Sequence, residues 1–135
     1  MAVVFDTNVL VSAAFFVGSK PSLAVRWAAE NDQILLSAAT ITELASTMER
    51  RKFDRYASLD KRREFVAFVF ACGQFVTIRR TVSACRDPGD DKFLDVAVNA
   101  NARYIVTGDA DLLTLASFEG TPILTPASYL VQAAG

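Results

Sequence analysis

Short apolar runs alternate with longer amphipathic segments along the chain. Residues 2–5, 33–36, 75–78 and 104–106 are apolar without polar alternation, a pattern typical of parallel strands buried on both faces. Helical patterns lie around residues 9–15, 22–30, 60–73 and 92–101, and an edge strand at 122–124 precedes a terminal helix at 126–133. Strands separated by helices predict an α/β fold: a three-layer α/β/α sandwich around a central, mainly parallel sheet.

Local signals predict two further helices and the start of the helix at 92–101. Thr40-Ile41-Thr42-Glu43 has the form of a capping box, which predicts a helix from Thr40 to about residue 51 with Glu43 in its first turn. The turn at 85–91 ends in two aspartates that are expected to cap the next helix. A short helix is predicted over residues 109–115.

The length and composition limit the possible classes of protein. A chain of 135 residues with 52% hydrophobic residues can bury one good core, so we expect a single domain over 1–135. No apolar run approaches the roughly 18 residues that cross a bilayer, and the first apolar run meets Asp6 too early for a signal peptide. We therefore expect a cytoplasmic protein with no membrane partner.

The residue types present exclude several kinds of chemistry. The chain has no His, which excludes a Ser-His-Asp triad, a Cys-His pair and a His-based zinc site. Its two cysteines, Cys72 and Cys85, lack zinc-ligand spacing, and we expect them to be buried free thiols. The chemistry must come from carboxylates, hydroxyls, amides, Lys and Arg.

Four acids are expected to meet at one edge of the sheet. Asp6 and Asp109 follow the first strand and the strand at 104–106, and Glu43 and Asp91 each begin a helix after a loop. In α/β sheets this carboxyl edge binds ligands, and gathered carboxylates are costly unless a cation neutralises them. Oxygen ligands favour Mg²⁺ or Mn²⁺, a cofactor suited to phosphodiester hydrolysis.

Each acid also has a purely local alternative. Asp6 suits an Asx-turn, Glu43 a capping box, Asp91 a helix N-cap and Asp109 a turn. Asp95 lies one helical turn after Asp91, and Asp111 lies two residues after Asp109. These two are candidates to support the site, although Asp95 also suits an exposed helix position and Asp111 a helix cap.

The two signs of charge are segregated, although the net charge is only −1. Ten of the fourteen basic residues lie between Arg50 and Arg86, whereas residues 87–111 carry six Asp against two basic residues. This pattern suits an enzyme that holds a polyanion with one part and metal ions with another. The alternative is charge that only solvates helix faces.

The combined motifs resemble the PIN-domain family, closest to the toxins of prokaryotic (VapC-like) toxin-antitoxin systems. The likeness covers essentially the whole chain, and it rests on Val3-Val4-Phe5-Asp6-Thr7-Asn8-Val9-Leu10, Thr40-Ile41-Thr42-Glu43-Leu44, Asp90-Asp91-Lys92-Phe93-Leu94 and Tyr104-Ile105-Val106-Thr107-Gly108-Asp109-Ala110-Asp111-Leu112-Leu113. The resemblance implies the α/β/α fold and a Mg²⁺- or Mn²⁺-dependent ribonuclease that cleaves single-stranded RNA.

The resemblance also implies residue roles and partners. Asp6, Glu43, Asp91 and Asp109 match the four family acids, with Asp111 as the alternative for the fourth. Asn8 and Thr107 match positions that support the metal or its water. From the charge pattern we expect Arg50, Arg51, Lys52 and Arg86 to contact RNA, with Asp87 or Asp90 as alternative ion-pair partners of Arg86. The family implies a cognate antitoxin that blocks the acidic pocket.

Several alternatives remain open. The apolar residues 65–72 suit either core burial or the surface of a homodimer. A haloacid-dehalogenase-like phosphatase needs a second Asp two residues after the first, where this chain has Asn8, and a receiver domain needs an early acidic pair that is missing. A catalytically silent RNA- or protein-binding module on the PIN scaffold would bind without metal-dependent cleavage.

Overall fold

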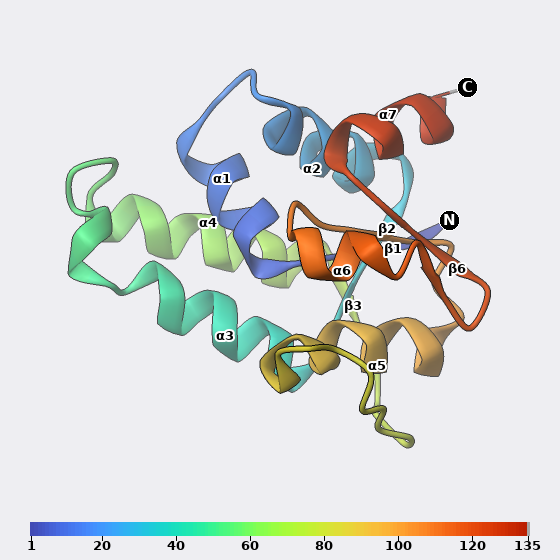
Figure 1. The fold of residues 1–135 in the computed structure, drawn as a ribbon. Helices are drawn as coiled ribbons and strands as arrows, with labels where there is room; N and C mark the ends of the chain where they lie inside the picture. The colour runs from blue at the N-terminus through green and yellow to red at the C-terminus, as the bar shows by residue number, and fades with distance from the viewer. Residues whose placement is uncertain (135) are drawn as a thin grey trace.

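The predicted α/β/α arrangement is confirmed by a computed structural model, which describes residues 1–134 (Figure 1). The sheet has the strand order β3-β2-β1-β4-β6-β5, and all neighbours are parallel except β5 and β6. Its strands are β1 (Ala2–Phe5), β2 (Gln33–Leu36), β3 (Gly73–Phe75), β4 (Tyr104–Val106), β5 (Ser117–Phe118) and β6 (Thr121–Leu124). The helices are α1 (Thr7–Phe15), α2 (Lys20–Asn31), α3 (Ala38–Met48), α4 (Leu59–Cys72), α5 (Asp91–Ala100), α6 (Ala110–Thr114) and α7 (Pro126–Ala134), with 3-10 turns η1 (Arg51–Phe53) and η2 (Pro88–Asp90).

The central strands are buried on both faces, and each face has its own hydrophobic core. Val3 and Phe5 of β1 pack with residues of α1, α2, α3, α4 and α7, while Val4 packs with α5 and α6 on the opposite face. This alternation follows from the strand period of two residues. It explains why these strands read as continuous apolar runs.

Helix α3 begins earlier than the sequence pattern predicted. Ser37 is the N-cap, and it forms a reciprocal capping box with Thr40, whose backbone N–H donates to the Ser37 Oγ at 3.2 Å. The prediction that Thr40 and Glu43 form the capping box was wrong, because a hydroxyl three residues after Ser37 completes the box without a carboxylate. Glu43 therefore lies beyond the first turn, with its side chain free for other contacts.

Two strand predictions also needed correction. Strand β3 begins at Gly73 instead of Phe75, since Gly73 lies directly against β2: a Cβ there would come within 2.9 Å of the Val69 carbonyl oxygen and overlap the side chain of Leu36. The strand predicted at 122–124 is β6, which is not at the edge, because the two-residue strand β5 pairs outside it. A two-residue strand has no hydrophobic period to detect.

Helix lengths bear on the expectation that no membrane is involved. Among residues 1–134, no single helix is long and apolar enough to cross a membrane. Within that range, only α1 and α2 taken together have the length and apolar composition of a membrane span, and the two helices are bent by 102° relative to each other.

Candidate active site

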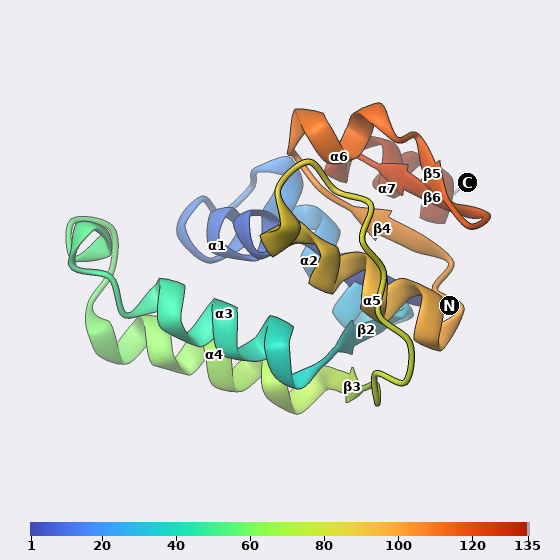
Figure 2. The ribbon, with the colours of Figure 1, turned by 60° about the horizontal axis from the view of Figure 1, so that its bottom comes forward.

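The candidate site lies where the strand order reverses. Strand β1 lies between β2 and β4, and the chain leaves β1 at Asp6 and β4 at Thr107. Phe5 pairs with Val106, so both exits are level at the carboxyl edge of the sheet. The first turns of α1, α3, α5 and α6 gather around this edge (Figures 1 and 2). Open α/β sheets bind ligands at this point, because diverging helices leave a crevice there.

Asp6 is held rigidly at the centre of the site. One carboxylate oxygen caps α1 by accepting from the backbone N–H of Asn8 at 2.6 Å, and the other accepts from the Thr107 hydroxyl. The residue is only 4% exposed. Burial raises the pKa of the Asp6 carboxyl above its ordinary value; the Thr107 hydrogen bond opposes the shift and the charge of Asp109 adds to it.

Glu43 reaches the site from α3 and has two partners that the sequence did not suggest. The Thr7 hydroxyl donates to Oε2 at 2.6 Å, and the Lys92 ammonium lies 3.1 Å from Oε1. Lys92 also donates to the carbonyl of Gly89. Thr7 and Lys92 stand next to predicted acids, but only the packing of α1, α3 and α5 shows that both contact Glu43.

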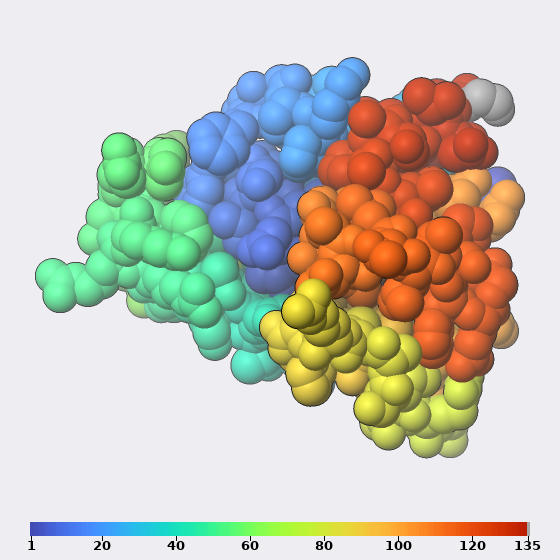
Figure 3. Space-filling view, in the orientation of Figure 1, coloured from blue at the N-terminus to red at the C-terminus, as the bar shows by residue number. Residues whose placement is uncertain are grey.

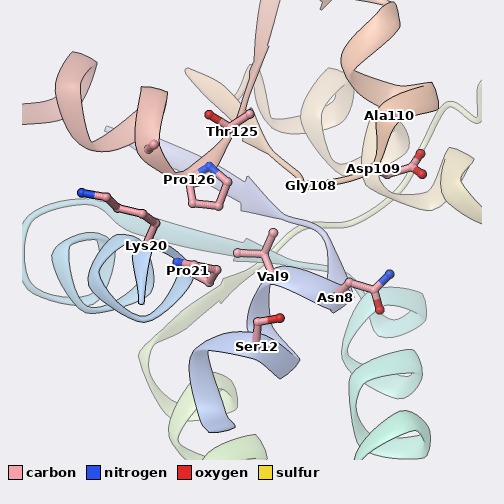
Figure 4. A pocket seen from close by; sticks show the side chains of 11 residues that line it. Asn8, Val9, Ser12, Lys20, Pro21, Gly108, Asp109, Ala110, Thr125 and Pro126 are labelled. Atoms are coloured by element: carbon pink, nitrogen blue, oxygen red, sulfur yellow. The ribbon is translucent and has the colours of Figure 1, made fainter. Parts of the chain in front are cut away.

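Asp109 caps α6, where its Oδ2 accepts from the backbone N–H of Leu112 at 3.1 Å. The residue borders two hollows in the surface. One, of about 510 Å³, is lined by Asn8, Ser12 and the starts of α2 and α7; Figure 4 shows the side chains of Asn8 and Asp109 directed to the same side of it. The other, of about 400 Å³, is lined by Arg86, Asp90 and Asp111. Asp109 therefore lies where the hollows meet.

The third predicted acid, Asp91, and its neighbour Asp90 have different surroundings. Asp91 turns toward the loop before α5, where its Oδ1 accepts from the backbone N–H groups of Cys85 at 2.8 Å and Ala84 at 3.1 Å. These bonds outweigh desolvation and hold the pKa of Asp91 below its ordinary value. Asp90 lines the same hollow as Asp109, and burial, followed by the charges of Asp87, Asp109, Asp6 and Glu43, raises the pKa of Asp90 to about 6.

The acids lie around the site, but they are too far apart to coordinate a metal ion together without water. Among residues 1–134, no three acidic or cysteine side chains are arranged to hold a metal ion directly. The donor chemistry nevertheless fits a hard cation, because Asp6, Glu43, Asp90 and Asp109 offer only oxygen and repel one another. Mg²⁺ commonly uses one or two carboxylates and keeps several waters, so this open arrangement suits a hydrated ion.

Comparison with known proteins agrees with this geometry. Residues 2–111 match the family model described as PIN domain. The chain belongs to the PIN-domain family. No sequence among the curated proteins matches it. Its fold is similar to that of VapBC2 from Rickettsia felis, solved bound to a DNA fragment from their promoter, with a TM-score of 0.62, 12% identity and 91% and 97% of the two chains covered. PAE2754 from Pyrobaculum aerophilum has a TM-score of 0.67 and 14% identity, with 100% and 91% covered.

The residues expected to support the acids of this PIN domain separate into two groups. Asn8 is exposed beside Asp6, and Thr107 is fully buried with its hydroxyl on Asp6. Asp95 lies elsewhere: its Oδ1 accepts from the backbone N–H of Val82 at 2.8 Å, which fastens the loop before α5 to that helix. Asp111 is exposed at the rim, where its carboxylate lies 4.0 Å from the Arg86 guanidinium.

The basic residues of this PIN domain lie in two places. Arg86 borders the hollow that contains Asp90 and Asp109, and its ion-pair partner is Asp111, not Asp87 or Asp90 as the sequence allowed. Arg50 and the η1 residues Arg51 and Lys52 are exposed beyond the far end of α3. Arg86 thus lies beside the acids, and the other three lie at a distance from them.

The two cysteines are free and half-buried, which agrees in part with the prediction of buried thiols. Burial and the charges of Asp91, Asp90 and Asp109 raise the pKa of Cys85 to about 12. A thiol that stays protonated is a poor nucleophile and a poor metal ligand, so Cys85 contributes packing instead of chemistry.

Proposed function

We propose that this PIN domain is a Mg²⁺- or Mn²⁺-dependent endoribonuclease that hydrolyses single-stranded RNA, and that it is the toxin of a toxin-antitoxin pair. The observation that carries the proposal is the meeting of Asp6, Glu43, Asp90 and Asp109 from four separate elements at the switch point of the sheet. Asp90 replaces Asp91 in the proposed set, because Oδ1 of Asp91 already accepts from two backbone N–H groups of the preceding loop, whereas Asp90 lines the hollow beside Asp109.

Each side chain around the four acids has a separate role in the proposed reaction. Thr107 and the first turn of α1 fix the orientation of Asp6, so that its oxygens are presented with little loss of side-chain entropy. Thr7 does the same for Glu43, and Lys92 neutralises Glu43 while no cation is bound. A divalent ion would supply a water of lowered pKa and stabilise the leaving oxygen of the phosphodiester. Arg86, at the rim, is suited to bind a neighbouring phosphate.

The test is cleavage of total bacterial RNA by the purified protein in Mg²⁺ or Mn²⁺, with EDTA and an Asp6→Asn variant alongside. Discrete fragments that require both the metal and Asp6 are expected. Mn²⁺ binding measured by calorimetry separates the alternatives. If the protein binds RNA but neither cleaves it nor binds Mn²⁺, the catalytically silent binding module is correct and the nuclease is not.

An antitoxin is the proposed protein partner. The solved relative from Rickettsia felis is a complex of VapB and VapC type, which supports a partner of that kind here. An antitoxin that blocks the site is expected to place a basic side chain among the four acids. Co-expression with its cognate antitoxin should therefore yield a stable complex that no longer cleaves RNA.

A homodimer stays a prediction. The apolar second half of α4 is divided between core and surface: Val69 is fully buried, whereas Phe68 and Phe70 are 48% and 57% exposed. Exposed aromatic residues of this kind are enriched at interfaces. We expect a dimeric mass by light scattering at micromolar concentration, and a monomeric mass would contradict it.

A further inference from the structure

We propose that the surface formed by the end of α1 and the α3–α4 turn, at the C-terminal end of α3, is a stacking platform for unpaired bases of single-stranded RNA. The platform consists of exposed aromatic side chains at the end of α1 and in the α3–α4 turn, together with the cations of that turn: Phe16, Arg50, Arg51, Lys52, Arg55 and Tyr56. This inference rests on the proposed function, because it takes RNA as the substrate, and it adds where the strand is held outside the acidic site.

Four aromatic rings form one cluster at this tip. Phe15 and Phe53 are half-buried, and Tyr56 stacks on Phe15 with ring centroids 5.4 Å apart and planes 26° apart. Phe16 meets the edge of Tyr56 at 5.7 Å. Phe16 and Tyr56 are 50% and 49% exposed, and the contacts with neighbouring rings hold both side chains in place. Rigid, half-exposed rings are what base stacking requires.

The side chains around the rings are positively charged, and their charges are not neutralised by neighbouring acids. Arg50, Arg51, Lys52 and Arg55 are exposed, and in the described part of the chain none of them forms an ion pair. The two acids within the same stretch are matched by other residues: Asp54 pairs with Arg62 and Glu49 with Arg63. Four uncompensated cations therefore remain beside the rings. Lys52 lies 5.1 Å from the Phe53 centroid, and the Arg55 guanidinium lies 5.4 Å from that of Tyr56.

The turn that presents these groups is held in one conformation by a buried arginine. Arg62, only 2% exposed, donates to the carbonyls of Met48 at 2.7 Å, Arg50 at 3.1 Å and Ala57 at 3.1 Å. A surface that is ordered before its ligand arrives loses less entropy on binding. Arg62 is thus a positioning residue for the platform.

Helix α3 leads from the acidic site to the platform. Glu43 lies on α3, and the helix ends at Met48, five residues later, which corresponds to about 7.5 Å along a helix axis; Arg50 follows two residues beyond that end. Figure 3 shows the α3–α4 end as a protrusion beside α1, continuous with the surface that leads to the start of α5. A strand of a few nucleotides can span from the acids to the rings, so both can act on one RNA molecule.

An RNA strand fits this surface better than a protein segment does. Alternating cations and exposed ring faces suit phosphates and bases in turn, whereas an apolar groove for a helix would lack the four free positive charges. Duplex RNA is disfavoured, because its bases are already stacked and their faces are covered. The platform therefore predicts a preference for unpaired RNA.

The experiment measures affinity for a fluorescein-labelled short oligouridylate by anisotropy in EDTA, so that cleavage does not interfere. Tyr56→Ala is expected to weaken binding by about 5-fold to 150-fold, the effect of losing one stacked base. Tyr56→Phe should bind like the wild type, since it keeps the ring face. Phe75→Ala is the matched control, because Phe75 is also a half-exposed aromatic residue but lies on β3, away from the α3–α4 turn. It should leave affinity unchanged.

Charge and fold are controlled separately. Replacing the four cations with Gln should reduce the slope of log affinity against log salt by about 3, at about 0.7 per phosphate. Thermal unfolding checks that each variant stays folded. Unchanged affinity in Tyr56→Ala, or no oligouridylate binding by the wild type, would overturn the platform. If the protein cleaves RNA with metal but Tyr56→Ala binds oligouridylate like the wild type, the platform is wrong and the nuclease proposal stands. If Tyr56→Ala weakens binding but no cleavage is found, the platform is supported and the nuclease proposal is wrong.

Discussion

Asp90 and Asp91 are neighbours in the chain, yet their carboxylates have opposite environments. The 3-10 turn η2 ends at Asp90, which lines the same hollow as Asp109, while Asp91 accepts two backbone hydrogen bonds from the preceding loop. Carboxylates that repel one another have raised pKa values, and carboxylates that accept N–H groups have lowered ones. At this scale a shift of one residue decides which side chain takes part in the site.

The two aspartates should therefore respond differently to the same substitution. Asp90→Asn is expected to weaken Mn²⁺ binding by at least about tenfold and to abolish RNA cleavage. Asp91→Asn should change neither, because the amide oxygen still accepts from Cys85 and Ala84; it should lower the free energy of unfolding by about 1 kcal/mol through loss of charge. Calorimetry with Mn²⁺ on both variants makes the comparison, and the reverse ranking would restore Asp91 to the site.

The raised pKa of Asp90 also predicts a dependence of stability on pH. Its pKa is about 6 in the folded protein and 3.8 when unperturbed, so between these values the folded state binds more protons than the unfolded state. The free energy of unfolding therefore falls as pH rises through this range. In EDTA, Asp90→Asn should be more stable than the wild type at neutral pH, and the difference should vanish below about pH 4. Melting temperatures across pH measure this; a constant difference would mean that Asp90 does not titrate with the cluster.

The α3–α4 turn shows how one side chain can organise an element boundary. The helix predicted to continue to residue 51 ends at Met48, and the carbonyls that follow are satisfied by Arg62 from the next helix. Its guanidinium suits this task, since it offers five N–H donors in a fixed geometry. The charge pattern could not reveal this, because Arg62 is one of three consecutive basic residues in the sequence and the other two are exposed.

Removing Arg62 is expected to destabilise the whole protein. Arg62→Met keeps much of the buried volume but leaves the carbonyls of Met48, Arg50 and Ala57 without this donor, which should lower the free energy of unfolding by about 2–5 kcal/mol. Denaturant unfolding measures the loss. Arg63→Met is the control, because its ion pair with Glu49 is exposed and should contribute less than about 1 kcal/mol. Equal losses of unfolding free energy in the two variants would contradict this role of Arg62.

Across the whole molecule, the fold gathers like charges from segments far apart in the sequence. Packing places Asp6, Glu43, Asp90 and Asp109 at one edge, and their repulsion is compensated within the described residues only by Lys92 and by hydroxyl or backbone donors. A cation bound among the four acids would reduce their repulsion and so stabilise the folded state. Stability should thus be linked to divalent metal.

Mn²⁺ at about 100 times its dissociation constant should raise the free energy of unfolding by about 2.7 kcal/mol. The measurement is thermal unfolding with and without Mn²⁺, and EDTA should reverse the shift. Asp6→Asn should show a smaller increase, because it removes the most buried of the four acids. A Mn²⁺-induced shift of the same size in the variant would mean that the ion binds elsewhere.

The sequence alone determined the class of fold and the family, and it limited the candidate chemistry to a few residue types. Buried parallel strands have continuous apolar runs, so β1, β2 and β4 were located correctly, and the absence of His left carboxylates as the source of chemistry. Asp6 follows β1 directly and Asp109 follows β4 after two residues, which is why their place at the sheet edge could be predicted. Local periodicity was sufficient wherever the relevant forces act between near neighbours in the chain.

Only the tertiary structure decided which of two adjacent acids faces the site, what pairs with Glu43 and what lies beneath the α3–α4 turn. The contacts between Glu43 and Lys92 and between Arg62 and Met48 join different helices, and no pattern along the chain records which side chains such packing brings together. The same is true of the exposed rings of Phe16 and Tyr56, which meet only because α1 ends beside that turn. Nonlocal contacts are set by the packing of whole elements, and that is why the structure was needed to find them.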